Sequence, residues 1–243
     1  MQPTAVVIGV GAEEGLGAAI ARRFAKGGFH VVVAGRTSAK IERVAASLGA
    51  GNGTAVKLDA TREDEVVRLF ETLSVATEGL AQPSVVVFNA GNNQRIPLLE
   101  VSSQQFEDFW RVGCHAGFLV GREAVKWLLP QRSGTILFTG ASASMRGRPA
   151  FAHFSAAKAG LRMLSQSMAR EFGPQGLHVA HVVIDGGIHG ERIKTLRPEV
   201  VDERGPNGLL DIDAIAETYW QLHAQHPSAW TQEIDLRPFK EPF

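Results

Sequence analysis

The sequence predicts an α/β fold in which a doubly wound parallel sheet of seven strands carries helices on both faces, as a three-layer sandwich. Short runs of β-branched residues recur along the chain and alternate with helical stretches. These runs lack a polar face, which is typical of parallel strands buried between helices. A length of 243 residues, of which 44% are hydrophobic, suits one domain over residues 1–243.

Each expected strand is an apolar run, from "TAVVIGV" at its start to "HVAHVVID" late in the chain. A seventh, weaker run near the end is followed by a tail with Pro and Phe that either covers the sheet edge or closes over a neighbouring subunit's site. The seven expected strands are 4–10, 30–35, 54–59, 84–91, 134–140, 178–185 and 229–235. The expected helices are 15–27, 38–48, 62–77, 103–129, 150–172 and 211–225.

Local signals place several helix ends. The glycine pair at 27–28 ends the first helix, the hydroxyl residues at 37–38 can cap the second, and the Gly-Pro pair at 173–174 ends the fifth. We expect a break near Gly113 in the fourth helix. The segment 186–210 is rich in Gly, Pro and charge, so it is interpreted as a loop, either a mobile lid beside the site or a solvated surface excursion.

Composition excludes several classes of function. Lys and Arg together number 25, as do Asp and Glu, and no polybasic segment stands out, which argues against a nucleic-acid partner. No apolar run is long enough to span a bilayer and the start lacks a signal-peptide pattern, so we expect no membrane partner and a cytoplasmic location. Cys114 is the only cysteine and the histidines lack metal-ligand spacing, so no disulfide and no metal site is expected.

A glycine-rich segment, Gly9-Val10-Gly11-Ala12-Glu13-Glu14-Gly15-Leu16-Gly17, lies between the first strand and the first helix. Glycines let the backbone turn tightly and approach a pyrophosphate, whose charge is met by the N–H groups and dipole of the helix start. This position makes a mere tight turn the weaker alternative and predicts a Rossmann-type dinucleotide site. The two glutamates weigh against tight binding, because carboxylates repel phosphates unless they turn away.

The second strand ends at Gly35 and is followed by Arg36. A protein that prefers NAD commonly has Asp or Glu here, on the ribose hydroxyls of adenosine. A guanidinium instead suits the 2′-phosphate of NADP through charge-assisted hydrogen bonds. We therefore expect NADP(H) as the preferred cofactor, with NAD(H) as the second choice and an ordinary surface arginine as the alternative interpretation.

With these motifs in order, the chain resembles the short-chain dehydrogenase/reductase family over nearly its whole length. The segment 11–17 looks like the family's TGxxxGxG, with Val10 where Thr is usual, and 58–60 looks like the segment whose Asp contacts adenine. Residues 89–91 match the NAG motif, and 154–158 match YxxxK except at the first letter. The cofactor-binding residues that the resemblance implies are Gly11, Glu14, Gly15, Leu16, Gly17, Arg36, Asp59, Ala60, Asn89, Ala90, Gly91, Lys158, Gly186 and Ile188.

The departures from the family pattern concentrate at the catalytic positions. Phe154 stands for the usual Tyr, Ala141 for the Ser thirteen residues earlier, and Gly113 for the Asn of the proton relay, whereas Lys158 is retained. Asp185 occupies the place of the Pro in the PG turn before Gly186. Candidate substitutes for the proton donor, for each of which we favour a structural role, are Ser142 next to Ala141, and Ser144, His115, His153, Asp185 and His189.

The resemblance implies an NADP(H)-dependent oxidoreductase that acts on alcohol or carbonyl groups of a small molecule, with an atypical active site. The alternative is a catalytically impaired nucleotide-binding protein that serves as a sensor, scaffold or partner subunit. The resemblance also suggests a homotetramer or homodimer through the helices at 103–129 and 150–172. Four large side chains fit either such an interface or the protein's own core: Trp110, Trp127, Met163 and Met168.

Overall fold

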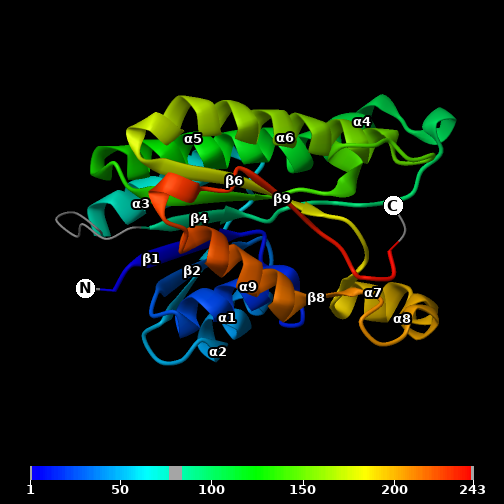
Figure 1. Ribbon diagram of the computed structural model, residues 1–243, viewed down its shortest axis with the longest axis horizontal. Coiled ribbons are helices and arrows are strands. Elements are labelled where there is room, and N and C mark those ends of the chain that lie inside the picture. Colours follow the sequence, from blue (N-terminus) through cyan, green and yellow to red (C-terminus); the bar gives the residue numbers. More distant parts are fainter. Residues whose placement is uncertain (1, 77–83, 242–243) are drawn as a thin grey trace.

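The computed structural model describes residues 2–76 and 84–241, and a seven-stranded parallel sheet runs through its centre (Figure 1). The strand order is β3-β2-β1-β4-β5-β6-β9, so the order reverses between β1 and β4, as in a doubly wound sheet. The predicted fold class is confirmed. The strands are β1 (Thr4–Ile8), β2 (His30–Gly35), β3 (Gly53–Lys57), β4 (Val85–Phe88), β5 (Gly134–Thr139), β6 (Leu177–Ile184) and β9 (Glu233–Leu236).

Helices cover both faces of the sheet, in the two layers that Figure 1 shows above and below it. One layer holds α3 (Glu63–Ala76), α4 (Ser103–Trp110), α5 (Ala116–Leu128) and α6 (Ala152–Phe172). The other holds α1 (Leu16–Lys26), α2 (Ser38–Ser47) and α9 (Ile212–His223). The last residue of the helix expected at 62–77 lies outside the described residues. Among the described helices, none combines the length and the apolar character that crossing a bilayer requires.

The inner strands of the sheet are buried on both faces because each face packs against its own helix layer, whereas the outer strands β3 and β9 are only partly buried. In β2, Val31 and Val33 join the core that includes α1 and α9, whereas Val32 and Ala34 join the core that includes α3, α5 and α6. This alternation follows from the two-residue period of a strand. It explains why the strands appear in the sequence as continuous apolar runs.

The expected break at Gly113 is a turn of π-helix, Arg111–His115, between α4 and α5. A Cβ atom on Gly113 would lie 2.9 Å from the Cβ of Ala157 on α6, which is closer than two carbons pack. The glycine therefore allows α6 to approach the turn. A side chain of the size of Asn at position 113 would require α6 to move.

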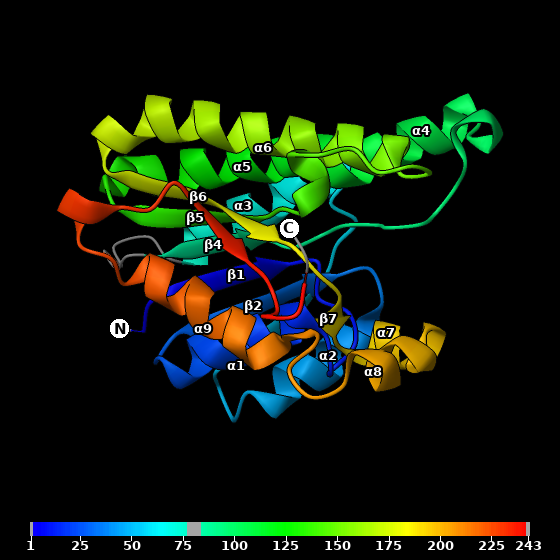
Figure 2. The ribbon, with the colours of Figure 1, turned by 45° about the vertical axis from the view of Figure 1, so that its right-hand side comes forward.

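The segment 186–210, expected to be irregular, contains four short elements. They are β7 (Ile188–His189), α7 (Glu191–Leu196), α8 (Pro198–Arg204) and β8 (Leu210–Asp211), and β7 pairs with β8 in a parallel two-stranded sheet. The segment lies beyond the carboxyl ends of the large sheet's strands (Figure 2). The expectation of an irregular loop was wrong. The short elements of this segment are held by contacts with residues far away in the sequence, including the glycine-rich segment, and local sequence patterns do not reveal such contacts.

The four large side chains on the helices divide between core and surface. Trp127 and Met168 are each 6% exposed and belong to the core. Trp110 on α4 is 40% exposed and Met163 on α6 is 50% exposed. Only the second pair is therefore free to contact another molecule.

Candidate active site

The glycine-rich segment bends directly from β1 into α1. Gly9 has a φ of +94°, and a Cβ there would lie 2.4 Å from the backbone nitrogen of Ala90, so only glycine fits between the ends of β1 and β4. A Cβ on Gly17 would lie 3.1 Å from the side-chain nitrogen of Asn89. By contrast, no atom lies within 4 Å of a Cβ built on Gly11. The backbone of this segment is thus closely packed at Gly9 and Gly17 but open at Gly11. Helix α1 begins after Gly15 and has no acidic residue in its first turn.

Each glutamate of this segment is held by a cation outside it. Arg43 Nε lies 2.9 Å from Glu13 Oε1, and Lys194 Nζ donates to Glu14 Oε2 at 2.9 Å. The hydrogen bond and charge of Lys194 hold the pKa of the Glu14 carboxyl below its ordinary value. The expected repulsion of phosphates by these two carboxylates is therefore offset by their partners.

Lys194 belongs to α7, and further contacts join this helix to the loops at the carboxyl end of the sheet. The backbone N–H of Glu191 donates to the carbonyl of Glu14 at 2.8 Å. Arg192 Nη2 donates to the carbonyl of Asn93, in the segment after β4. The segment expected to be a loop or lid is thus attached to both loops that the candidate site uses.

Replacing Lys194 by Ala is expected to weaken NADPH binding about two- to fivefold at low salt, because the Glu14 carboxylate then faces the phosphates without a partner. Glu14→Gln in the same chain should restore the affinity. Arg197→Ala is the matched control, since Arg197 pairs with Glu199 within the same segment and away from the glycines. Fluorescence titrations measure the NADPH affinity of the wild-type protein and of these three variants. An undiminished affinity in Lys194→Ala would contradict this role of the ion pair.

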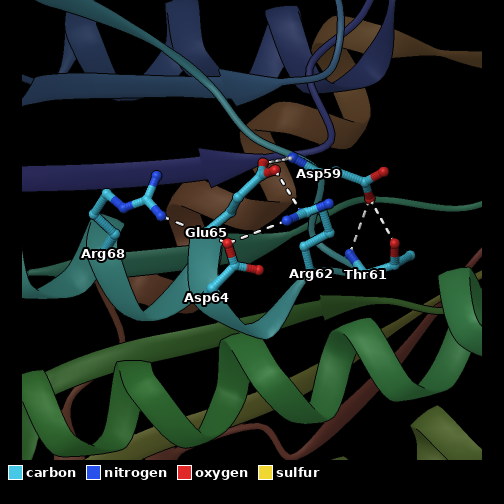
Figure 3. Close-up of polar contacts among 6 residues, drawn as sticks. All are labelled: Asp59, Thr61, Arg62, Asp64, Glu65 and Arg68. Atoms are coloured by element: carbon cyan, nitrogen blue, oxygen red, sulfur yellow. Dashed lines mark hydrogen bonds and ion pairs between the residues drawn. The ribbon is translucent and has the colours of Figure 1, made fainter.

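Arg36 follows β2 and is exposed, and within the described ranges no acidic side chain forms an ion pair with it. Asp59, after β3, accepts hydrogen bonds on Oδ1 from the backbone N–H and the hydroxyl of Thr61, at 3.0 and 2.8 Å (Figure 3). Its own N–H donates to Glu65 Oε2 at 2.8 Å. Asp59 therefore builds the turn before α3, with the buried Ala60 beside it.

A hydrogen-bonded chain links the ends of three strands. Asn89 donates through Nδ2 to the carbonyl of Gly9 at 3.2 Å and accepts from the hydroxyl of Thr139 at 3.0 Å. Because Thr139 has a single hydroxyl proton, the hydroxyl of Tyr219, at 2.7 Å, is the donor to it. The amide of Asn89 thus holds the glycine-rich segment against β5.

Sequence reasoning missed Thr139 and Tyr219. Tyr219 is the only tyrosine in the chain, is fully buried in α9, and has a pKa raised above its ordinary value by burial. This phenol is therefore a support for the strand ends and not a proton donor at the position of Phe154. Because the chain has a single tyrosine, at position 219, the sequence already showed that it does not stand at the position of the family's Tyr.

Lys158 reaches the same strand ends from α6. Its Nζ donates to the carbonyl of Thr139 at 2.8 Å, and a Cβ on Gly91 would lie 3.4 Å from it. The side chain is buried, and burial lowers its pKa to about 8, partly opposed by Cys114. Phe154, one helical turn earlier, is half-buried and carries no titratable group.

Ala141 and Ser142 follow β5, and Ser142 is joined to Asp185 after β6. Burial acts to raise the pKa of Asp185, but hydrogen bonds from Ser142 and Arg146 and the charges of Arg146 and Arg237 hold it below its ordinary value. Ser142 thus belongs to the group of polar side chains that lowers the pKa of this carboxyl.

The other candidate donors differ in their surroundings. His153 shares a hydrogen bond of 3.0 Å with the carbonyl of Gln94 and packs edge-on against Phe109. His115 stacks on Trp110, with ring centroids 5.5 Å apart. His189 belongs to β7 and directly precedes Gly190, which packs against the backbone carbonyl of Glu14. Ser144 is buried, and no partner of its hydroxyl is found within the described residues.

Gly186 and Ile188 continue the chain from β6 towards α7. Gly186 has a φ of +150°, and a Cβ there would lie 2.7 Å from Cδ of Pro238, so the chain's tail packs directly on this turn. Ile188 is half-buried and packs against the core beneath α1. Both residues lie at the carboxyl end of the sheet, where the resemblance places cofactor contacts.

Comparisons with known proteins agree with this arrangement. A family described as "short chain dehydrogenase" matches residues 5–199. YuxG of Bacillus subtilis, described as an uncharacterized oxidoreductase, is 33% identical over 77% of this chain, which spans only 28% of that protein's length. A short-chain dehydrogenase structure from Rhodopseudomonas palustris is 39% identical, with a TM-score of 0.79, over 98% of this chain and 99% of that one.

A second solved structure contains a nucleotide. It is from Beutenbergia cavernae, is assigned as an NAD(P)-dependent gluconate 5-dehydrogenase, and holds NADP at low occupancy. It is 25% identical to this chain, has a TM-score of 0.84, and the match covers 97% of this chain and 95% of that one.

Proposed function

Because the chain belongs to the short-chain dehydrogenase family, we propose that it is an NADP(H)-dependent oxidoreductase that interconverts an alcohol and a carbonyl group of a small molecule. One observation carries this proposal. The ammonium of Lys158 lies beside Gly91, and Asn89 of the same segment holds the glycine-rich turn. The glycine-rich turn, Asn89, Gly91 and Lys158 thus lie together at the carboxyl ends of β1 and β4, where the strand order reverses, and this arrangement supports a nucleotide site.

The residues at this edge fit a dinucleotide phosphate. Space is open beside Gly11, the two glutamates of the glycine-rich segment are paired with cations, and the start of α1 offers backbone N–H groups to an anion. Arg36 is exposed and without an acidic partner among the described residues, as a ligand of the 2′-phosphate would be. The NADP in the Beutenbergia structure supports the same choice.

When bound, a nicotinamide nucleotide supplies the hydride that reduces a carbonyl carbon or accepts it from an alcohol. In this site Lys158 would hold the nicotinamide ribose hydroxyls. Phe154 would form an apolar wall where the family has its phenol, Ala141 would leave the substrate oxygen without the usual hydroxyl, and Gly113 would interrupt the relay. Proton transfer would then depend on water or on the substrate itself, which slows the reaction.

The activity is tested by stopped-flow measurement of nicotinamide absorbance with a panel of aldehydes, ketones, oxo acids and quinones. We expect NADPH oxidation that is slow but above background with at least one carbonyl class. Absence of turnover above background with every class, by a protein that binds NADPH, would contradict the oxidoreductase and favour the second candidate function.

Cofactor choice depends on Arg36. Arg36→Ala is expected to weaken NADPH binding roughly 10- to 100-fold, because charge-assisted hydrogen bonds to the 2′-phosphate are lost. NADH lacks that phosphate, so its affinity should not change and serves as the control. Equal losses for both nucleotides, measured by fluorescence titration, would remove Arg36 from the 2′-phosphate site.

The second candidate is a nucleotide-binding sensor, scaffold or partner subunit without efficient catalysis. It is favoured by the absence of a titratable group at position 154 together with Ala141 and Gly113 at the positions of the family's Ser and Asn. Tight NADPH binding without turnover, established by calorimetry on the protein used for stopped flow, distinguishes it from the oxidoreductase.

We also propose that the protein forms a homodimer or homotetramer through α4, α5 and α6, in the helix layer that also holds α3. Exposed large apolar residues gather on the helices of this layer, where isologous packing would bury them: Phe106, Trp110, Phe118 and Met163.

A further inference from the structure

Asp185 is a fully buried carboxylate that holds two arginines from different loops. Arg146 Nη2 lies 2.7 and 2.8 Å from its two oxygens, and Arg237 Nη2 lies 2.9 Å from Oδ2. An unpaired buried charge is strongly unfavourable, so this carboxylate fixes the side chains around it. Asp185, which occupies the position of the family's Pro, thus fixes Arg146 beside the end of β5.

Arg146 is only partly used by this contact. Its side chain is 37% exposed, and both hydrogen bonds to Asp185 come from Nη2. Within the part of the chain that the structure describes, Nε and Nη1 have no partner. Charged donors that are fixed by a buried carboxylate and still open to solvent are preorganised to bind an anion.

The loops around Arg146 carry further positive charge. Arg95 and Arg148 are exposed, and the backbone N–H of Ile96 donates to the carbonyl of Ala150 at 2.9 Å, which joins their two segments. Arg192 is fixed to the carbonyl of Asn93 in the first of these segments. No acidic partner of Arg95, Arg148 or Arg192 occurs among the described side chains, although the whole chain has a net charge of zero. The local field therefore attracts anions.

Arg146 also lies at the edge where chemistry is proposed. It belongs to the turn that begins at Ala141, since its backbone N–H donates to the carbonyl of Ser142 at 3.1 Å. Ala141 follows the strand whose last residue, Thr139, accepts from Lys158. An anion on Arg146 would therefore share the end of β5 with Lys158.

We propose that the substrate carries a carboxylate which Arg146 binds and Asp185 positions through Arg146, so that the substrate class is a hydroxy acid or an oxo acid. This inference rests on the proposed function, because it places the alcohol or carbonyl group of that reaction on a molecule with an acid group. Arg146 is the residue that contacts the substrate, and Asp185 is a positioning residue.

The test uses pairs of small oxo acids or hydroxy acids and their methyl esters, titrated by calorimetry at constant ionic strength with and without NADP⁺. We expect at least one acid to bind about tenfold or more tightly than its ester, and Arg146→Gln to remove this difference without changing ester binding. Arg146→Lys should restore it in part. Arg170→Gln, on the far end of α6, is the matched control and should retain the full difference.

Asp185→Asn should reduce the ratio of acid to ester affinity while leaving the ester unaffected, which a merely structural role would not do. If Arg146→Gln does not fold because Asp185 loses a partner, the double variant Asp185→Asn/Arg146→Gln keeps the test. Equal binding of acids and esters, or retention of the difference in Arg146→Gln, overturns the proposal. So does binding of phosphate monoesters in preference to every carboxylate.

The nucleotide-free arm separates the two proposals. If NADP⁺ fails to bind while the acid preference and its dependence on Arg146 persist, the proposed function fails and the carboxylate site stands. If NADP⁺ binds and no acid is preferred, the carboxylate site fails and the oxidoreductase stands.

Discussion

Replacing Phe154 by Tyr and Ala141 by Ser together is expected to raise NADPH-dependent carbonyl reduction by about two to four orders of magnitude, which is the typical contribution of a general acid. The phenol would lie one helical turn before Lys158, whose positive charge lowers the pKa of such a group. The introduced serine would add a hydroxyl directly after β5, next to Ser142. The measurement is the single-turnover rate of NADPH oxidation.

Three controls sharpen this result. Phe151→Tyr adds the same phenol at a half-buried position just before α6 and should leave the rate unchanged. Each single variant should gain less than the double variant, because the two groups act on one oxygen. Lys158→Met in the double variant should abolish the gain. A folded double variant that binds NADPH and reduces carbonyls no faster than the wild-type protein would contradict the inference that these two missing groups limit the reaction.

Replacing Lys158 by Met is expected to abolish turnover and to stabilise the nucleotide-free protein. The buried ammonium has a pKa of about 8, against 10.5 for an ordinary lysine. Below pH 8 the folded protein therefore bears a desolvation cost, on the order of 3 kcal/mol by the usual conversion of pKa shifts. Loss of the hydrogen bond to the Thr139 carbonyl opposes this by about 1 kcal/mol, so the variant should gain about 2 kcal/mol at pH 7.

The pH dependence of this difference in stability follows from the direction of the pKa shift of Lys158. The folded protein releases the proton of Lys158 at lower pH than the unfolded chain, so the unfolded state binds more protons between pH 8 and 10.5. Wild-type stability should rise relative to Lys158→Met as pH increases through that window. Denaturant unfolding at several pH values measures this, with exposed Lys57→Met as control. A stability difference independent of pH would contradict the buried ammonium.

The sequence predicted the large sheet because its inner strands are buried on both faces and can therefore be read as mainly apolar runs. The break at Gly113 was also predictable, since glycine is unfavourable within a helix. In contrast, α7 and α8 are too short for a helical period to appear. Their positions depend on partners such as Glu14 and Asn93, which are remote along the chain.

The residues of the candidate site also fall into those that the sequence predicts and those that only the structure shows. The glycine-rich turn, Asn89 and Lys158 have spacings along the chain that by themselves indicate a role. The group around Asp185 does not, because Arg146 and Arg237 belong to different loops that only the sheet brings together. Tyr219 likewise shows its role only through its contact with Thr139.

The central claim is that this edge of the sheet binds NADP(H) while providing no side-chain proton donor beside the nicotinamide. A crystal structure of the protein with NADP⁺ tests it most directly. We expect the 2′-phosphate on Arg36, the nicotinamide ribose on Lys158, and no ionisable side chain other than Lys158 within hydrogen-bonding distance of a carbonyl oxygen placed against the nicotinamide. A nucleotide bound elsewhere, or a histidine or carboxyl group at that oxygen, would contradict it.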